Sequence, residues 1–447
     1  MEFLLLPIVI LFIFAVFMFA VTPYAAVITI LLVSVVNAWF IEPPSVIIGI
    51  HIYLYDLVFV PLFLSTLFRV MIKGEWRYVS VLWTIYGLII FYGLFPGLKL
   101  YGTYAGVDFR SLFCYWTGAV YFMTFAYSKE MLDKVYKYWL VICSLLLLIV
   151  YFRFVADFLN LPIAATWITA DATGVRFRVT DSGQAYLLSA ALIMLFQRYV
   201  TSEAAQPSRI LTVAFLVAVI VLQHRSVWAA TIVAIATMFL LPGIKTHKII
   251  GKLTIVGIVG IVLMVPLVFY GYADHFIDSI TGSAERATHL ETGTFGSRVK
   301  YWERIMIYWN KLGFWDQLFG EPWGSGYAGS PRTPHNMFFY SLLRAGSFGT
   351  LIYILLYLAL LIKLFFNILA NKDCRLYTSL FFMLIVAQMV FYIPYSPLPQ
   401  HGIILGIAMS LAKRKLGGNQ IENKTDNKAY HLKPIVKTQT AETVHAA

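Results

Sequence analysis

Long apolar runs alternate with short polar segments over most of this chain. Many of these runs approach the ~20 residues that a helix needs to cross the ~30 Å hydrocarbon core of a bilayer. Lipid offers no partners to free backbone groups, so membrane-crossing segments are helices unless they close into a barrel. The pattern therefore predicts an all-α, polytopic transmembrane helical bundle.

We expect about 12–13 spans, because that many apolar runs approach the roughly 20 residues that one span needs. The predicted spans cover residues 3–21, 24–40, 52–71, 79–95, 108–127, 135–155, 181–199, 209–223, 226–241, 250–271, 346–369, 376–393 and 399–412. The first run has no basic segment before it and no small-residue cleavage site after it, which favours a retained helix over a signal peptide. Thirteen spans put the N-terminus outside and twelve put it inside, and both remain open.

Composition supports a membrane protein, with 60% hydrophobic and 13% charged residues, against about 25% charged in ordinary soluble domains. The net charge of +12 comes from basic residues dispersed in short loops and the tail. The positive-inside rule accounts for such a distribution, so no nucleic-acid partner is predicted. The three cysteines lie far apart and form no Cys/His cluster, which indicates neither a disulfide framework nor a metal site.

The basic loops predict which side each span end faces. Clusters at 69–77, 129–137, 198–209, 245–252, 363–375 and 413–415 alternate with loops poor in Lys and Arg, so we place them in the cytoplasm. The prediction is a transmembrane domain over residues 1–415 and a cytoplasmic, disordered tail over residues 416–447. Residues 156–180, the link 223–226 and one long loop at about 272–334 then face outward.

The long outer loop contains a segment with helical amphipathicity. Arg298, Trp302, Ile305 and Trp309 follow 4, 3, 4 spacing and would share one face of a helix. Such a helix would lie in the outer membrane interface with its aromatic face down. It is either purely structural or also presents Arg298 to a substrate.

Two further residues stand where polar groups are costly unless they are paired or solvated. Arg225 lies between two apolar runs, and it is either a snorkelling arginine or an anion clamp, because a guanidinium matches phosphate oxygens. His335 opens an apolar segment after a glycine-rich turn that lacks a nucleotide-binding P-loop motif. It is either a hydrogen-bonding cap or a residue that takes a proton from a hydroxyl.

His335 and Asn336, followed by nine residues and then Gly346, resemble a known signature. It is the H-[N/S/Q]-x9-G motif of the O-antigen ligase and O-antigen polymerase family of bacterial membrane glycosyltransferases. The flanking context is similar as well: Arg225, the Ser297, Arg298 and Trp302 stretch, and the Gly324 and Gly326 turn. The resemblance covers about residues 175–395. Gly349 stands where a polar residue or Tyr would be expected, which argues against a strict ligase and leaves a polymerase or a relative open.

This resemblance implies a GT-C-like fold in the bacterial inner membrane, with the active site facing the periplasm. It implies metal-independent transfer, without a cofactor, of a glycan from an undecaprenyl-pyrophosphate-linked donor to a sugar hydroxyl of lipid A core or a growing glycan. His335 would accept the proton, and Arg225 and Arg298 would stabilise the leaving pyrophosphate. The expected substrate-binding residues are Asn336, Trp302, Arg110, Arg178 and Gly346.

A transporter or flippase for a lipid-linked sugar or another anion is the main alternative. Transporters tend to place ionisable residues near the middle of the bilayer, in broken helices of paired repeats. Asp56 is the clearest charge that we predict near the middle of a span, and the sequence shows no internal repeat. A non-catalytic subunit of a glycan assembly machine is a third possibility.

Overall fold

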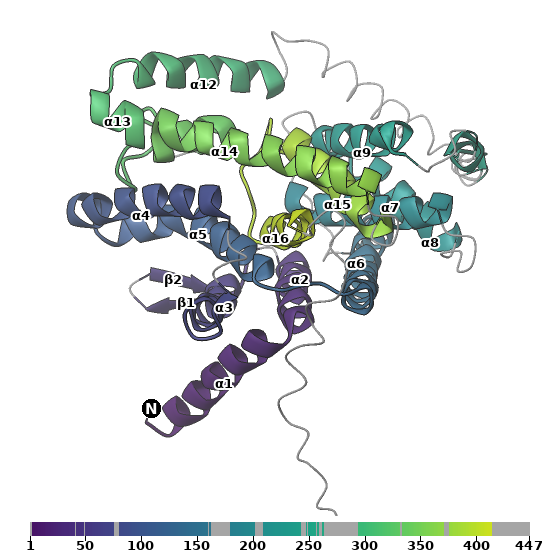
Figure 1. The fold of residues 1–447 in the computed structure, drawn as a ribbon, viewed down its shortest axis with the longest axis horizontal. Helices are drawn as coiled ribbons and strands as arrows, with labels where there is room; N and C mark the ends of the chain where they lie inside the picture. The colour runs from purple at the N-terminus through teal and green to yellow at the C-terminus, as the bar shows by residue number, and fades with distance from the viewer. Residues whose placement is uncertain are drawn as a thin grey trace, which may run out of the picture. The chain divides into compact units, whose positions relative to one another are not determined.

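The structure is a computed structural model in which most of the chain is helical, as the apolar pattern predicts (Figure 1). It describes residues 2–40, 42–48, 50–75, 80–159, 161, 179–201, 209–242, 247, 249–255, 257–258, 262, 294–330, 333–370 and 375–413. The predicted cytoplasmic tail, 416–447, and most of the predicted span 250–271 lie outside these residues.

Helices occupy most of the predicted spans. They are α1 (Glu2–Val21), α2 (Pro23–Trp39), α3 (Leu54–Met71), α4 (Val81–Tyr101), α5 (Thr103–Met123), α6 (Lys129–Phe158), α7 (Ser182–Thr201), α8 (Arg209–Val221), α9 (Arg225–Thr237), the short 3-10 helix η3 (Met238–Leu240), α12 (Thr294–Trp309), α13 (Phe314–Phe319), α14 (Met337–Ala370), α15 (Arg375–Phe391) and α16 (His401–Ala412). Four of the described helices are long and apolar enough to cross a membrane: α3, α4, Lys129–Asp157 of α6, and α14. The fold is thus compatible with a helical membrane bundle.

A small β-hairpin precedes α3 and was not predicted. Strands β1 (Ser45–Ile48) and β2 (Ile50–Tyr53) pair antiparallel, with Ser45 opposite Tyr53. The hairpin takes the first two residues of the predicted span 52–71, so α3 begins at Leu54. β-branched residues favour a strand, and four isoleucines and one valine lie in this short stretch.

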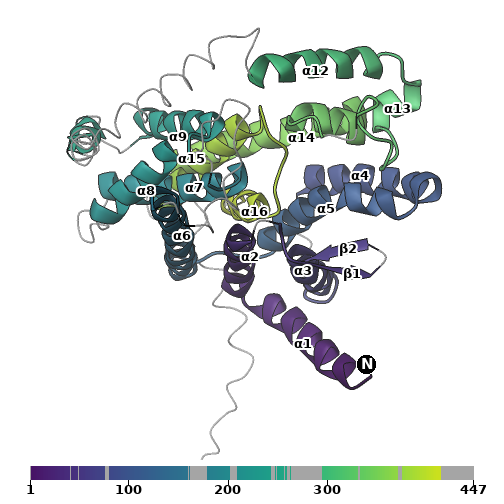
Figure 2. The same cartoon turned by 180° about the vertical axis from the view of Figure 1, so that it is seen from behind.

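Helices α7 and α16 form the interior of the bundle. Every residue of α7 from Gly183 to Gln197 is buried, and α16 is buried from His401 to Met409. Figures 1 and 2 show α16 close to α2 and α5 from both sides. Gly406 allows the close approach to α5, because a Cβ there would lie 2.5 Å from the Ala119 carbonyl oxygen.

Several described helix ends that carry predicted cytoplasmic cations contact one another, and we call this the basic end. Arg69 at the end of α3 donates to the Thr124 hydroxyl at 2.8 Å, and Ser410 of α16 donates to the neighbouring Phe125 carbonyl at 2.6 Å. Arg198 of α7 pairs with Asp133 of α6 at 2.5 Å. These contacts join helix ends that the charge alternation assigns to the same side, and which side of the membrane this is remains a prediction.

The other helix ends form the opposite end, which carries the residues with predicted chemistry. The Met337 N–H at the start of α14 donates to the Tyr392 carbonyl after α15 at 3.0 Å. His224, the N-cap of α9, lies 3.1 Å from the Thr180 carbonyl before α7, and Ser111 of α5 donates to the Pro397 carbonyl at 3.2 Å. That this end faces the periplasm remains a prediction.

Candidate functional site

The predicted amphipathic helix is confirmed as α12, and its aromatic face packs against protein. Ile305 is fully buried, while Glu303 and Arg304 are exposed. The Trp302 ring stacks on Phe339 of α14 with centroids 5.7 Å apart. In Figures 1 and 2, α12 runs beside the first part of α14. The aromatic face therefore fixes α12 to the start of α14, instead of lying free for a lipid surface as we expected.

The glycine-rich segment after α13, residues 320–330, is held by Arg344 of α14. The Arg344 side chain is completely buried, and it donates to the Pro322 and Gly326 carbonyls at 3.1 and 2.8 Å and to the Ser325 hydroxyl at 2.7 Å. Its charge is balanced by Asp108 of α5, whose carboxylate lies 2.7 Å away. Sequence reasoning missed Arg344, although an arginine in an apolar run was the available signal.

The same segment docks on α4 through Trp323. The indole is fully buried and donates to the Ile90 carbonyl at 2.8 Å. Gly97 allows this approach, because a Cβ at that position would lie 2.5 Å from the Trp323 carbonyl oxygen. Asp108 also accepts the Gly324 N–H at 3.0 Å and the Tyr327 hydroxyl. The glycine-rich segment is thus held on α4, α5 and α14 by these contacts.

His335 lies between two fixed residues while being exposed itself. On one side, the Trp302 indole donates to the Pro334 carbonyl at 3.0 Å. On the other side, the Asn336 amide oxygen accepts the N–H groups of Phe338 and Phe339 at 2.8 and 3.1 Å, so it caps α14. The φ angle of His335 is +48°, a conformation that is uncommon for residues other than glycine and is often found at functional sites.

Gly346 has a structural role that explains its place in the motif. Its φ of +67° interrupts α14, and a Cβ there would lie 2.2 Å from the Leu318 carbonyl oxygen. The bend therefore lets α13 pack closely on α14. Asn336 and Gly346 thus shape the helix that begins beside His335.

The two predicted catalytic arginines both lie at the opposite end. The Arg298 guanidinium, half-buried on α12, lies 5.2 Å from the centre of the Tyr395 ring. Tyr395 belongs to the segment 392–400, which also supplies the Tyr392 carbonyl that binds Met337. This segment brings Arg298 and the His335 region to one place. Arg225 is the first residue of α9 and is half-buried at the same end.

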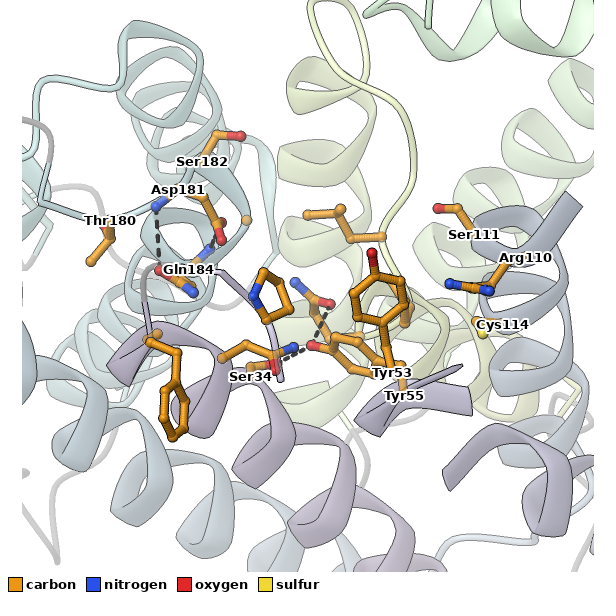
Figure 3. Close-up of a pocket in the computed structure, with 18 of the residues that line it drawn as sticks. Ser34, Tyr53, Tyr55, Arg110, Ser111, Cys114, Thr180, Asp181, Ser182 and Gln184 are labelled. Carbon is orange, nitrogen blue, oxygen red and sulfur yellow. Dashed lines mark hydrogen bonds between the residues drawn. The ribbon is translucent and has the colours of Figure 1, made fainter. Parts of the chain in front are cut away.

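A cavity of about 640 Å³ opens at the opposite end (Figure 3). It lies between α2, α5, α6, the start of α7 and residues 398–400. Figure 3 shows Arg110, Ser111 and Cys114 on one wall and Thr180, Asp181 and Gln184 on the other. Between them, the Tyr55 hydroxyl bonds the Ser34 hydroxyl at 2.6 Å and donates to the Gln400 side chain at 3.4 Å. The size suits a small ligand, since such sites span about 300–1,000 Å³.

Arg110 is the predicted site residue that lines this cavity, and protein groups already hold its guanidinium. Its Nε lies 3.1 Å from Asp56, and its Nη2 donates to the His51 carbonyl at 2.7 Å. Asp56 sits in the first turn of α3, where its carboxylate also accepts the Tyr53 N–H at 2.8 Å. Our placement of Asp56 in the middle of a span is therefore wrong, because the hairpin moves the start of the helix to it. Arg178 lies outside the described residues.

Within the described part of the chain, no group of three or more His, Cys, Asp or Glu side chains is arranged to hold a metal ion. Cys114 and Cys143 are buried free thiols, and Cys374 lies outside the described residues. Comparison of the chain with models of known protein families gives no match, and a search of curated proteins gives none. The family resemblance thus depends on the motif residues themselves.

Proposed function

We propose that this chain is a membrane glycosyltransferase of the O-antigen ligase or polymerase type. It would transfer a glycan from an undecaprenyl-pyrophosphate carrier to an acceptor sugar hydroxyl on the periplasmic side of the inner membrane. The acceptor would be lipid A core or the end of a growing glycan. The motif of His335, Asn336 and Gly346 suggested this function, and the geometry around His335 supports it best.

The observation that carries the proposal is an exposed imidazole on an immobilised backbone. Trp302 holds the residue before His335, and the Asn336 cap holds the residue after it. Preorganisation of this kind suits a general base, which must meet its proton in a defined position. A histidine suits the role because its ordinary pKa lies close to neutral pH.

The proposed reaction needs only groups that the chain supplies. His335 takes the proton of the acceptor hydroxyl as the acceptor oxygen bonds to the anomeric carbon of the donor sugar. The bond between that carbon and the phosphate oxygen breaks, and its electrons leave with the undecaprenyl pyrophosphate. Arg298 and Arg225 would stabilise the growing negative charge, and His335 returns its proton to solvent.

Transfer assays with matched variants test this function. Proteoliposomes that contain the full chain receive undecaprenyl-linked glycan and acceptor, and the glycan that reaches the acceptor is measured. We expect His335→Asn to lower the transfer rate about 100-fold or more, within the range that general-base catalysis contributes. Asparagine tolerates the left-handed backbone, so this change removes the imidazole with little strain. Arg298→Ala should also lower the rate.

The controls use the same residue types at positions away from the proposed site. His51→Ala changes an exposed histidine of the hairpin, and Arg304→Ala changes the exposed face of α12; both should keep wild-type rates. Equal rates for His335→Asn and His51→Ala would reject the assigned base. Movement of the lipid-linked glycan across the bilayer without any transfer would instead support the transporter alternative.

A further inference from the structure

The cavity between α5 and α7 offers mainly uncharged hydrogen-bonding groups to a ligand. Its lining includes the hydroxyls of Ser34, Ser111 and Thr180 and the amides of Asn37 and Gln184. These groups come from helices α2, α5 and α7 and from Thr180, two residues before α7, so the fold assembles them from distant parts of the sequence. The apolar remainder of the wall includes Phe40, Val107 and Leu398.

The charged groups of the cavity are engaged by the protein itself. Arg110 is paired with Asp56 at 3.1 Å, which cancels its charge locally. Arg153 is buried and donates to the carbonyls of Val179 and Ala38. Asp181 accepts the Gln184 N–H at 2.8 Å at the start of α7 and opposes the charge of Arg153. A phosphate would therefore have to displace existing partners, so Arg110, which the sequence suggested as a substrate-binding residue, is poorly placed to bind one.

Two buried oxygen atoms in the cavity wall lack a hydrogen-bond partner among the described residues. They are the Thr180 hydroxyl and the Asn37 side-chain carbonyl. Thr180 as a whole residue is 8% exposed. Buried polar groups normally have partners, and an orphan costs free energy unless a ligand or water satisfies it. These two atoms mark where a ligand with hydroxyl groups would bind.

We propose that this cavity is a subsite for an uncharged sugar residue of the glycan, separate from the place where the pyrophosphate leaves. The inference rests on the proposed function and deepens it by assigning the sugar and the pyrophosphate to different parts of the opposite end. Sugar hydroxyls both donate and accept, so they match the mixed hydroxyl and amide lining. The Tyr55 and Tyr53 side chains add aromatic surface to the same wall.

The segment 392–400 connects this sugar subsite with the His335 region. Leu398 and Gln400 line the cavity, while Tyr392 binds the Met337 N–H and Tyr395 lies against Arg298. A glycan bound in the cavity would thus lie on one side of this segment and the reacting groups on the other. The subsite would hold the sugar chain while its terminal residue reacts.

Native mass spectrometry of the purified full chain in detergent micelles tests the subsite. One probe is the mixture of neutral oligosaccharides released by mild acid from the lipid-linked glycans of the native cells, and the other is inorganic pyrophosphate. We expect an oligosaccharide to bind the wild type and pyrophosphate not to compete with it. Thr180→Val should weaken this binding about 3- to 10-fold, the effect of one hydrogen bond. The double variant Thr180→Val, Asn37→Leu should bind the oligosaccharide more than tenfold more weakly than the wild type.

Thr66→Val is the matched control, because Thr66 is a buried threonine of α3 whose hydroxyl bonds its own helix at the Leu62 carbonyl. It should bind oligosaccharide like the wild type. Neither Thr180→Val nor Asn37→Leu removes a described side-chain hydrogen bond, so both variants should melt no lower than the wild type. If Asn37→Leu lowers the melting temperature, the oligosaccharide binding of Thr180→Val alone decides whether the cavity is a sugar subsite.

The inference is overturned if the wild type retains no neutral oligosaccharide, if Thr180→Val binds as Thr66→Val does, or if pyrophosphate competes for the site. Transfer activity without such binding would remove the subsite and leave the proposed function intact. Binding that depends on Thr180, without transfer, would keep a sugar site and reject the transferase.

Discussion

At the residue scale, the pair of Arg344 and Asp108 at the opposite end joins a completely buried guanidinium to a carboxylate 2.7 Å away. Asp108→Asn should destabilise the protein by about 3–5 kcal/mol, because it leaves a fully buried guanidinium without its counter-charge. Thermal unfolding in detergent measures the loss. Asp133→Asn breaks a pair whose carboxylate is 44% exposed and should cost about 1 kcal/mol or less. Equal melting temperatures for the two variants would contradict this account.

Glu321, in the glycine-rich segment, should make stability depend on pH. Its side chain is buried, accepts the Tyr308 hydroxyl, and has its pKa raised chiefly by burial. The folded state therefore holds the Glu321 proton more tightly than the unfolded state. Its contribution to stability is complete below the ordinary pKa of 4.5 and is lost as the pH rises through the raised value.

The test compares melting temperatures of the wild type, Glu321→Gln and Glu303→Gln between pH 4 and pH 8. Glu321→Gln keeps the acceptor for Tyr308 and removes the titration, so its stability relative to the wild type should increase as the pH rises. Glu303 is exposed on α12, so Glu303→Gln should follow the wild-type profile. A Glu321→Gln profile parallel to that of the wild type would refute the assigned burial effect.

The sequence predicted features that depend only on neighbouring residues along the chain. It did not predict residues whose role depends on a contact with a distant part of the sequence. The spacing of Arg298, Trp302 and Ile305 predicted the face of α12, because helical periodicity is a property of the segment itself. Arg344 acquires its role only when α5 brings Asp108 to it, and no local pattern encodes that pairing. The cavity escaped for the same reason, since α2, α5 and the start of α7 must meet before it exists.

At the element scale, the bend in α14 gives Gly346 a requirement for glycine that a glycine inside a regular helix does not have. Gly346→Ala should lower the melting temperature strongly, since its backbone (φ +67°, ψ −173°) lies in a region essentially open only to glycine, which costs alanine roughly 1–3 kcal/mol, and the Leu318 carbonyl blocks its Cβ. Gly106→Ala in α5 meets no atom within 4 Å and should be neutral or stabilising. Similar melting temperatures for the two variants would show that the bend relaxes without cost.

Helix positions followed from apolar runs, whereas helix ends did not. The runs located α7 and α15 to within two residues, because a buried helix is apolar around its whole circumference. The predicted span 346–369 began at the bend, and α14 starts earlier, at Met337, where Asn336 caps it. The β-hairpin was missed, because its last two residues were assigned to the span 52–71 and its other residues to no element, and four-residue strands are hard to tell from buried helix segments by hydropathy.

At the scale of the whole molecule, the positive-inside pattern predicts which end of the bundle faces the cytoplasm, and an experiment can test this orientation. Lys137 belongs to α6 near the basic end and Lys311 follows α12 near the opposite end, and both are exposed. The positive-inside rule puts Lys137 in the cytoplasm and the α12 region outside. Because the helix ends are grouped at the two ends of the bundle, one labelled residue at each end reports the orientation of the whole bundle in the membrane.

One cysteine introduced at each of these positions in turn measures the orientation of the bundle in the membrane. In a background that carries Cys374→Ser and retains the buried Cys114 and Cys143, Lys311→Cys should react with a membrane-impermeant maleimide in intact spheroplasts. Lys137→Cys should react only after permeabilisation. Labelling after denaturation checks that both proteins are present in equal amounts. The reverse pattern would put His335 and the cavity on the cytoplasmic side, away from a periplasmic glycan acceptor, and would exclude the proposed reaction there.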